Sequence, residues 1–465
     1  MKKLSSQFDY RFKNNCISPF IQSAICIGLL ASTLLAVSLE ARKPNVILIY
    51  TDDQGSIDLN CYGAKDLYTP HLDQLAKKGI KFSQFYSAAP VCSPSRAAVL
   101  TGRFPQHAGV PGNVSSAQGH VGMPSSQTTI AEMMKSAGYA TAHIGKWHLG
   151  YTPDTMPNGQ GFDTSFGHMG GCIDNWSHFF YWNGPNRHDL WKNGKEIWED
   201  GQFFPDLMVR ETDEFISQNK EKPFFIYWAI NVPHYPLQGT GGWRTFYDHL
   251  PEPRKMYAAF VSTMDEKIGE VIKSVDQHGL TRDTIIIFQS DHGHSTEDRT
   301  FGGGGDAGPY RGAKFSLFEG GIRVPAIISW PGHIKEDLTR NQLATSIDWF
   351  PTIADLCDIP LPASSIDGAS LTPILQSSDA PGSHATFHWQ TGSRNKPQWA
   401  VREGNWKLLG NPNDTSNKAP IQDGDKWYLV NLEKDVGEMN NVASDHPDIV
   451  RKLSQLHQDW ARKWR

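Results

Sequence analysis

Four short, mostly apolar segments of this chain are each followed, after one to three intervening residues, by a charged or imidazole side chain. They cover residues 45–50, 139–144, 224–230 and 284–288. Such runs are typical of strands buried on both faces of a parallel sheet. Open α/β sheets place their sites at the carboxyl ends of strands. The side chains that follow these runs are therefore candidates for one shared site: Asp52, Asp53, Lys146, His148, His234, Asp291 and His292.

The segments between these strands predict helices that cover the sheet. Thr69 before a proline is a start signal for a helix over residues 70–78. Thr129 and Glu132 have the spacing of a capping box at the start of another helix. Residues 254–277 carry an apolar stripe at helical spacing. The alternation of strands and helices predicts an α/β fold, in which a large, mostly parallel sheet is sandwiched by helices.

The sequence pattern changes near Thr386. Residues 399–402 and 406–409 predict a hairpin, and residues 427–430 predict one more strand. A terminal helix with one apolar face is expected from Pro447 onward. We expect these segments to form a small antiparallel sheet plus a helix, packed against the main part of the chain.

The chain is expected to divide into three parts. Positive residues precede an apolar run within residues 1–41, which predicts a secretory signal peptide. An uncleaved amino-terminal anchor is the alternative, because the run is close to the length that spans a bilayer. We expect an exported protein, periplasmic or secreted, without stable membrane insertion after cleavage. Residues 42–385 form the predicted catalytic domain, and residues 386–465 form the predicted C-terminal α+β subdomain.

The motif Cys92-Ser93-Pro94-Ser95-Arg96 is the most specific signal in the chain. It resembles the signature of the sulfatases, in which the cysteine of C-x-P-x-R is oxidised to formylglycine. For the motif alone, an ordinary buried thiol before a helix is the alternative. Further segments match the same family in order: Gly145-Lys146-Trp147-His148, Pro233-His234, Asp291-His292-Gly293, Lys314 and Phe318-Glu319-Gly320-Gly321.

This resemblance covers roughly residues 44–375. It implies a formylglycine-dependent (type I) sulfatase of the alkaline-phosphatase-like superfamily. It also implies a partner, the maturation enzyme that generates formylglycine from Cys92.

Two pairs of strand-end side chains form a candidate cation site. Asp52 and Asp53 follow the first strand, and Asp291 and His292 follow a late one, so the pairs meet if those strands are neighbours. Carboxylate oxygens suit a hard cation such as Ca²⁺. Turn chemistry is the alternative explanation for the two adjacent aspartates. The resemblance adds residue 92 to the ligands and implies one Ca²⁺ per chain, held by Asp52, Asp53, Cys92, Asp291 and His292.

The resemblance also implies a covalent cycle at residue 92. One hydroxyl of the hydrated aldehyde attacks sulfur, and Asp291 is the expected proton acceptor. His148 then takes the proton of the second hydroxyl, which expels sulfate and restores the aldehyde. His234, or alternatively Lys314, protonates the leaving alcohol.

Three further roles implied by the resemblance belong to cationic side chains. Arg96 lies one helical turn after Cys92, from where its guanidinium can reach the formylglycine hydroxyl and the metal carboxylates. Lys146 and Lys314 are expected to offset the charge on the sulfate oxygens. Lys146 and His148 are separated by one residue, and we expect an extended segment that orients them alike.

Charge and cysteine content narrow the function classes. The 465 residues carry a formal net charge of −5 and no block of Lys or Arg, so a nucleic-acid partner is not expected. Of the six cysteines, Cys61, Cys172 and Cys357 remain once the signal segment and residue 92 are set aside. Either one disulfide or three free thiols fit that remainder.

Residues 172–198 combine many aromatic side chains with His and Arg, which suits a glycan site. We expect Trp176 and His178 to contact the sugar, with core packing as the alternative. His294 and Glu297 are expected to reach the leaving sugar. The chain resembles bacterial polysaccharide sulfatases of the carrageenan type and N-acetylgalactosamine-6-sulfatases, so a sulfated carbohydrate, such as a carrageenan-like galactan, is the expected substrate.

Two other functions are kept as alternatives. Phosphonate monoester hydrolases and phosphodiesterases can carry the same formylglycine signature and metal pair, and turnover of a phosphonate ester would distinguish them. A non-catalytic binder of sulfated glycans is the second alternative. The intact set of site residues argues against it, because a silent protein has no need of both proton-transfer histidines.

Overall fold

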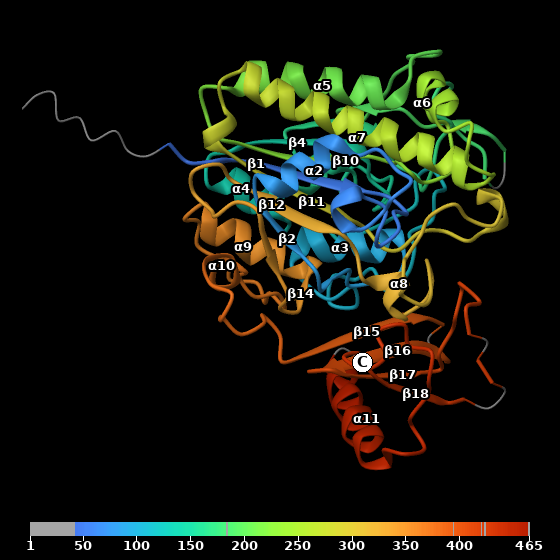
Figure 1. Ribbon diagram of the computed structural model, residues 1–465. Helices are drawn as coiled ribbons and strands as arrows, with labels where there is room; N and C mark the ends of the chain where they lie inside the picture. Colours follow the sequence, from blue (N-terminus) through green and yellow to red (C-terminus); the bar gives the residue numbers. More distant parts are fainter. Residues whose placement is uncertain (1–41, 183–184, 394, 420, 423–424, 464–465) are drawn as a thin grey trace, which may run out of the picture. The chain divides into compact units, whose positions relative to one another are not determined.

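A mixed sheet lies at the centre of the computed structural model, which describes residues 42–463 apart from 183–184, 394, 420 and 423–424 (Figure 1). The predicted signal segment, residues 1–41, lies outside the described residues. The strands of this sheet follow one another in the order β13 (Leu338–Arg340), β2 (Ile80–Phe82), β12 (Ala326–Ser329), β11 (Thr284–Ser290), β1 (Asn45–Thr51), β10 (Phe224–Ala229), β4 (Ala140–Lys146), β5 (Thr164–His168), β8 (Trp191–Lys192) and β9 (Lys195–Glu196).

The middle of the sheet is parallel, and β1 lies between β11 and β10. Thr51 at the end of β1 pairs with Ser290 at the end of β11, so the polar residues after both strands begin at neighbouring points. β10 also pairs in parallel with β4, and β4 with β5. The carboxyl ends of these strands therefore meet at one edge of the sheet, as the sequence predicts.

Helices cover both faces of the sheet, because successive residues of each central strand point to opposite sides. Val46 and Leu48 belong to one core, whereas Ile47 and Ile49 belong to the other. Figure 1 shows α5 and α7 on one side of the sheet and α3, α9 and α10 on the other. One face carries α2 (Pro70–Lys77), α5 (Phe204–Asn219), α6 (Gly241–Phe246) and α7 (Arg254–Gln277), and the other carries α3 (Cys92–Thr101), α4 (Ile130–Ser136), α9 (Trp349–Leu356) and α10 (Thr372–Gln376).

Short elements complete the main part of the chain. Two small sheets pair β3 (Phe85–Tyr86) with β14 (Ala344–Thr345), and β6 (Phe179–Phe180) with β7 (Arg187–His188). The remaining helical turns are α8 (Glu319–Ile322) and the 3-10 segments η1 (Asn60–Tyr62), η2 (Pro157–Gln160), η3 (Thr281–Asp283), η4 (Asp298–Thr300) and η5 (Ser346–Asp348).

The predicted C-terminal antiparallel sheet is present, with the terminal helix α11 (Pro447–Arg462) packed on it. Its strands follow in chain order: β15 (Thr386–Gly392), β16 (Pro397–Glu403), β17 (Trp406–Gly410) and β18 (Trp427–Asn431). Lys407 of this sheet forms buried ion pairs with Glu319 of α8 at 2.8 Å and with Glu438 at 2.9 Å. A buried charge cluster therefore joins the C-terminal sheet to the main part of the chain.

The α/β fold and the long helix α7 are confirmed, the latter with the predicted bounds of residues 254–277. The capping box of Thr129 and Glu132 is also confirmed. Thr69 occupies the predicted N-cap position before α2, which begins at Pro70, but its hydroxyl hydrogen-bonds to Asn60 and leaves the side-chain capping place unfilled. Asp265 of α7 takes that place, and its carboxylate accepts hydrogen bonds from backbone N–H groups in the first turn of α2.

The described part of the chain bears on two expectations for an exported protein, namely whether a helix could span a membrane and whether the cysteines form a disulfide. Within it, none of the helices combines the length and the apolar character that crossing a bilayer requires. Cys61, Cys172 and Cys357 are free thiols there, so the three-thiol alternative fits and the single disulfide does not.

Candidate active site

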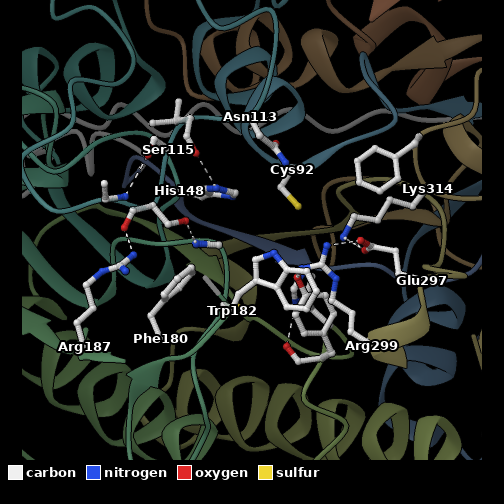
Figure 2. Close-up of a pocket in the computed structure, with 18 of the residues that line it drawn as sticks. Cys92, Asn113, Ser115, His148, Phe180, Trp182, Arg187, Glu297, Arg299 and Lys314 are labelled. Atoms are coloured by element: carbon white, nitrogen blue, oxygen red, sulfur yellow. Dashed lines mark hydrogen bonds and ion pairs between the residues drawn. The ribbon is translucent and has the colours of Figure 1, made fainter. Parts of the chain in front are cut away.

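Cys92 lies at the start of α3, where its thiol meets side chains from three strand ends. Every residue of α3 is buried, including Cys92 itself. The Cys92 Sγ atom lies 3.6 Å from Lys146 Nζ, 3.5 Å from His292 Nε2 and 3.8 Å from Asp52 Oδ1. Figure 2 shows this sulfur directed into a pocket. The backbone N–H groups of the first turn of α3 favour negative charge at this position.

The two aspartates after β1 and the one after β11 converge as the strand order requires. The Asp53 backbone N–H donates to Asp291 Oδ1 at 3.1 Å, and Asp53 has a left-handed φ of 60°. Burial raises the pKa of Asp53 to about 6 and that of Asp291 to about 8. Burial also opposes the charge on Asp52, but Lys146 and its other cationic neighbours hold the pKa of Asp52 well below its usual value.

These carboxylates have the chemistry of a divalent cation site. Ligand atoms of Asp52, Cys92, Asp291 and His292 lie within 4.8 Å of one another, and the same holds for Asp52, Asp53, Cys92 and His234. Asp53 Oδ1 is buried and has no hydrogen-bond partner among the described residues. An unpaired buried carboxylate oxygen is costly, and a cation would compensate it. The donor set therefore fits the group that the sequence predicts.

His292 is oriented as a metal-binding histidine would be. Its Nδ1 lies 3.0 Å from the Gly293 carbonyl oxygen, which can only accept, so Nε2 is left with the lone pair. Nε2 lies 3.5 Å from both Asp53 Oδ1 and Asp291 Oδ2. Burial opposes protonation, but Asp291 and the other negative neighbours raise the pKa of His292 to about 9. A proton on His292 and a divalent cation compete for the same carboxylates, so cation binding would release the proton.

Three buried cations surround the carboxylates. Arg96 lies 3.4 Å from Asp52 Oδ1 and 3.2 Å from Asp291 Oδ2 through Nη2, as predicted for its contact with the carboxylates. Lys146 Nζ lies 2.6 Å from Asp52 Oδ2. Lys314 Nζ lies 2.8 Å from the second aspartate, Asp53, at Oδ2. Each carboxylate therefore holds a cation at a fixed position beside Cys92.

The two histidines proposed for proton transfer are buried near the same point. His234 Nδ1 lies 2.8 Å from the Tyr235 carbonyl oxygen, and Nε2 lies 3.7 Å from Asp53 Oδ2. Burial lowers the pKa of His148 and that of His234, so both rings are held neutral. The expected extended segment at 146–148 is wrong, because Lys146 ends β4 and His148 takes a left-handed φ of 56°. The His148 side chain lines the pocket beside Cys92.

The Cys92 thiol forms part of a cavity of about 650 Å³. Figure 2 shows Phe180 and Arg187 on one side of Cys92, and Lys314, Glu297 and Arg299 on the other. The lining residues are Cys92, Asn113, Val114, Ser115, Ser116, Ala117, His148, Gly171, Cys172, Phe180, Trp182, Pro185, Arg187, His234, Tyr235, Glu297, Arg299, Lys314 and Phe315.

Comparison with known proteins identifies the chemistry of this pocket. The family described as Sulfatase matches residues 44–359, which is more than half of the chain. This chain belongs to the sulfatase family. A second family, described as N-sulphoglucosamine sulphohydrolase, C-terminal, matches residues 311–463. The sulfatase is therefore a sulfuric ester hydrolase, and its fold is that of the alkaline-phosphatase-like superfamily.

Relatives of the sulfatase match it over most of their length. Human arylsulfatase A is 33% identical over 456 residues, covering 90% of this chain and 87% of that protein. The N-acetylgalactosamine-6-O-sulfatase of Bacteroides thetaiotaomicron is 30% identical over 497 residues, covering 90% and 93%. The crystal structure of Ps i-CgsB superposes with a TM-score of 0.80 at 30% identity, covering 90% and 93% of the two chains. A further structure of that protein, in complex with k-i-k-neocarrahexaose, has a TM-score of 0.79.

The pocket of the sulfatase differs from the sequence prediction in its walls. Phe180, Trp182 and Arg187 of the predicted sugar segment line the pocket, and so does Glu297. Trp176, His178 and His294 do not. Trp176 packs on a neighbouring phenylalanine, and His178 is fully buried. The aromatic density of residues 172–198 thus serves both core and pocket, and composition alone does not separate the two uses.

Two parts of the pocket were missed in the sequence. The loop at residues 113–117 contributes only small and polar side chains, which give no pattern. Arg299 stacks over the Trp182 ring at 3.2 Å from its centroid and forms an ion pair with Glu297. Its place two residues after Glu297, in the loop that follows the metal pair, was the available signal.

Proposed function

We propose that this sulfatase removes sulfate from a sulfated polysaccharide through a formylglycine formed from Cys92. The observation that carries the proposal is the position of Cys92 Sγ, which lines the pocket and lies within 4 Å of Asp52, Lys146 and His292. A nucleophile at this point reaches the substrate and the cation site together. When hydrated, formylglycine supplies one hydroxyl to attack sulfur and a second whose deprotonation releases sulfate.

Ca²⁺ is the cation we propose, one per chain. Asp52, Asp53, Asp291, His292 and the converted residue 92 would hold it. Bound there, it would polarise a sulfate oxygen and lower the pKa of the nucleophilic hydroxyl. The predominance of carboxylate oxygens supports Ca²⁺ over a softer cation.

We assign the proton transfers to three side chains around residue 92. Asp291 accepts the proton of the attacking hydroxyl, and His148 accepts that of the second hydroxyl when sulfate leaves. His234, with Lys314 as the alternative, donates a proton to the leaving alcohol. Support for His148 comes from burial, which lowers the pKa of this histidine and keeps its ring neutral, ready to accept a proton.

Binding of the sulfate group is assigned to the buried cations. Lys146 and Lys314 lie on the two aspartates that flank residue 92, and they would stabilise the negative charge on the sulfate oxygens. Arg96 would hold Asp52 and Asp291 in place and face the hydroxyl of residue 92. All three are nearly inaccessible to solvent, which strengthens their electrostatic effect on a bound anion.

The outer pocket supports an anionic saccharide as substrate. Arg187 lies over the Phe180 ring at 3.9 Å, and Arg299 lies over Trp182, so aromatic faces and guanidinium groups alternate along the walls. The Nε atoms of both arginines are buried without a hydrogen-bond partner in the part of the chain that the structure describes. A protein with a net charge of −5 thus offers local donors to a polyanion. We propose a carrageenan-like galactan as the polysaccharide.

Export and maturation complete the proposal. Residues 1–41 would act as a signal peptide that leads the chain to the periplasm or out of the cell, and a formylglycine-generating enzyme would act on Cys92. Residues 42–385 would form the catalytic domain and residues 386–465 the C-terminal subdomain.

The chemistry at residue 92 is tested directly by peptide mass analysis of active enzyme. We expect formylglycine at position 92, in an amount that tracks specific activity among preparations. Full activity from protein with an unmodified Cys92 would refute the mechanism. Sulfate release across a panel of sulfated polysaccharides then tests the substrate, and turnover of a phosphonate ester in parallel tests the phosphonate hydrolase alternative.

A further inference from the structure

A second cluster of metal-binding side chains lies at the base of the β6–β7 hairpin. His178 immediately precedes β6, His188 ends β7, and Asp200 follows β9. One imidazole nitrogen of each histidine and one carboxylate oxygen of Asp200 lie within 4.8 Å of one another. None of the three lines the cavity at Cys92, so the cluster is separate from the active site.

The hydrogen bonds of the two histidines determine which ring nitrogen is free. His178 Nε2 lies 3.0 Å from the Gln202 carbonyl oxygen, and His188 Nδ1 lies 3.0 Å from Glu196 Oε1. Both oxygens only accept, so these nitrogens carry the hydrogens. The lone pairs therefore lie on His178 Nδ1 and His188 Nε2. Metal-binding histidines ordinarily donate their other N–H to a carbonyl or carboxylate in this way.

Both free nitrogens are buried and unused. His178 is 0% exposed and His188 is 4% exposed. Within the described residues, neither His178 Nδ1 nor His188 Nε2 has a hydrogen-bond partner. A buried acceptor without a partner is costly, so two of them on the histidines of one cluster require an explanation.

Packing does not account for the arrangement. Trp198 stacks on the His188 ring at a centroid distance of 3.8 Å and an angle of 9°, and Phe204 meets the His178 ring at 63°. The stacked contact covers the face of the His188 ring. Ring nitrogens bond in the plane of the ring, so such a contact fixes the orientation and leaves the lone pair available.

We propose that His178, His188 and Asp200 bind one Zn²⁺ ion. Two imidazole nitrogens and one carboxylate oxygen suit zinc, with a fourth position for water, whereas Ca²⁺ takes oxygen ligands. Asp200 is exposed, which gives the ion a path from solvent. The ion would join the two ends of the hairpin whose Phe180 and Arg187 form one wall of the substrate pocket, and so would hold that wall in place.

The test is zinc binding by the Ca²⁺-saturated enzyme, measured by metal analysis after dialysis and by titration calorimetry. Asp200→Asn is the decisive variant, because an exposed side chain can be changed without disturbing the core. We expect zinc to bind the variant at least about tenfold more weakly than the wild type. Asp154→Asn is the matched control, since Asp154 is also exposed and lies outside the cluster.

A second readout uses Co²⁺ in place of zinc. The wild type and Asp154→Asn should show the visible absorption of a four-coordinate cobalt site, and Asp200→Asn and His188→Ala should lose it. Zinc should also raise the melting temperature of the wild type but not of Asp200→Asn. If Asp200→Asn binds zinc as tightly as the wild type, or if the Ca²⁺-saturated wild type binds none, the proposal is wrong. Should His188→Ala fail to fold, Asp200→Asn decides alone.

Discussion

Two clusters of acidic and basic side chains in this sulfatase are both buried, but they lie in different surroundings. The active-site cluster gathers Asp52, Asp53, Asp291 and their cations at the strand ends and opens onto a cavity. The joint cluster, composed of Glu319, Arg323, Lys407 and Glu438, lies between α8 and the C-terminal sheet.

In the joint cluster, both carboxylate oxygens of Glu319 have partners. One carboxylate oxygen of Glu319 forms an ion pair with Lys407 at 2.8 Å. The other accepts a hydrogen bond from the Tyr86 hydroxyl at 2.6 Å and lies 3.2 Å from the Arg323 guanidinium. Burial opposes the charge of Glu319, but Lys407 and Arg323 lower its pKa to about 2. In the active-site cluster, by contrast, Asp53 keeps a bare oxygen and the pKa of Asp291 is raised to about 8. Glu438 of the joint cluster also has a pKa that burial raises, to about 7, and its Oε1 has Lys407 at 2.9 Å but no hydrogen bond among the described residues. The two clusters therefore differ mainly in access, because the active-site cluster opens onto a cavity and the joint cluster does not line it.

The largest expected effect comes from removing the nucleophile beside the active-site cluster. Cys92→Ser should lower turnover of any sulfate ester by a factor of at least about 10⁴, because a serine sulfate ester has no second hydroxyl with which to expel sulfate. The variant should remain folded by circular dichroism. Turnover within tenfold of the wild type would contradict the role of residue 92.

Breaking the joint cluster should lower the stability of the protein and leave its turnover rate unchanged. Lys407→Met leaves Glu319 and Glu438 buried without their shared cation, which should cost about 3–5 kcal/mol of unfolding free energy. Denaturant unfolding measures this, and kcat of the folded fraction should not change. Lys452→Met is the control, because its pair with Glu403 is exposed and should contribute about 0–1 kcal/mol. Equal losses for the two variants would remove the distinction between the clusters.

Of these two charge clusters, the active-site cluster should respond to chelation and the joint cluster should not. Stripping the divalent cation should abolish turnover, and saturating Ca²⁺ should restore it. At a concentration of one hundred times Kd, Ca²⁺ should add about 2.7 kcal/mol of stability. If the chelator changes neither the melting temperature nor the turnover rate, the cation site is refuted. If Asp53→Asn responds to the chelator as strongly as the wild type does, the cation lies elsewhere.

A smaller effect is expected at the pocket wall. Arg299→Ala should reduce turnover of a sulfated polysaccharide by about tenfold or more, since a charged hydrogen bond to the saccharide is lost. Turnover of a small aryl sulfate should fall much less, because that substrate makes no remote contact. Trp176→Ala, outside the pocket, should leave the ratio of the two rates unchanged. A ratio that responds to Trp176 and not to Arg299 would restore the original sequence prediction.

The effect that is smallest at neutral pH concerns a buried group that belongs to neither cluster. His143 lies in β4 among the rings of Trp147, Phe162 and Tyr227, and burial lowers its pKa to about 3. Between about pH 3 and 6.5, the unfolded chain therefore binds a proton at His143 and the folded chain does not. Stability is full above pH 6.5 and declines as the pH falls toward 3, by up to about 1.4 kcal/mol per pH unit. His143→Leu should flatten this slope, whereas His249→Leu, at an exposed site, should not.

Local patterns were sufficient for the scaffold and for the centre of the site. The run at 45–50, the stripe at 254–277 and the capping box at Thr129 report on neighbours in sequence, where periodicity and hydrogen-bonding geometry are the same in any fold. The convergence of Asp52 with Asp291 followed from the fact that parallel strands end at one edge. The signature at Cys92 identified the family because its residues are contiguous.

The tertiary structure decided the features that depend on irregular segments. Arg299 reaches Trp182 from a loop with no periodicity, and Lys407 meets Glu319 across 88 positions of sequence. The cap of α2 comes from Asp265 on another helix, although Thr69 was the better local candidate. His178 was interpreted as a sugar contact because composition shows which side chains are present but not which way they face. Chain sequence specifies local geometry directly, whereas contacts between loops depend on the packing of the whole fold.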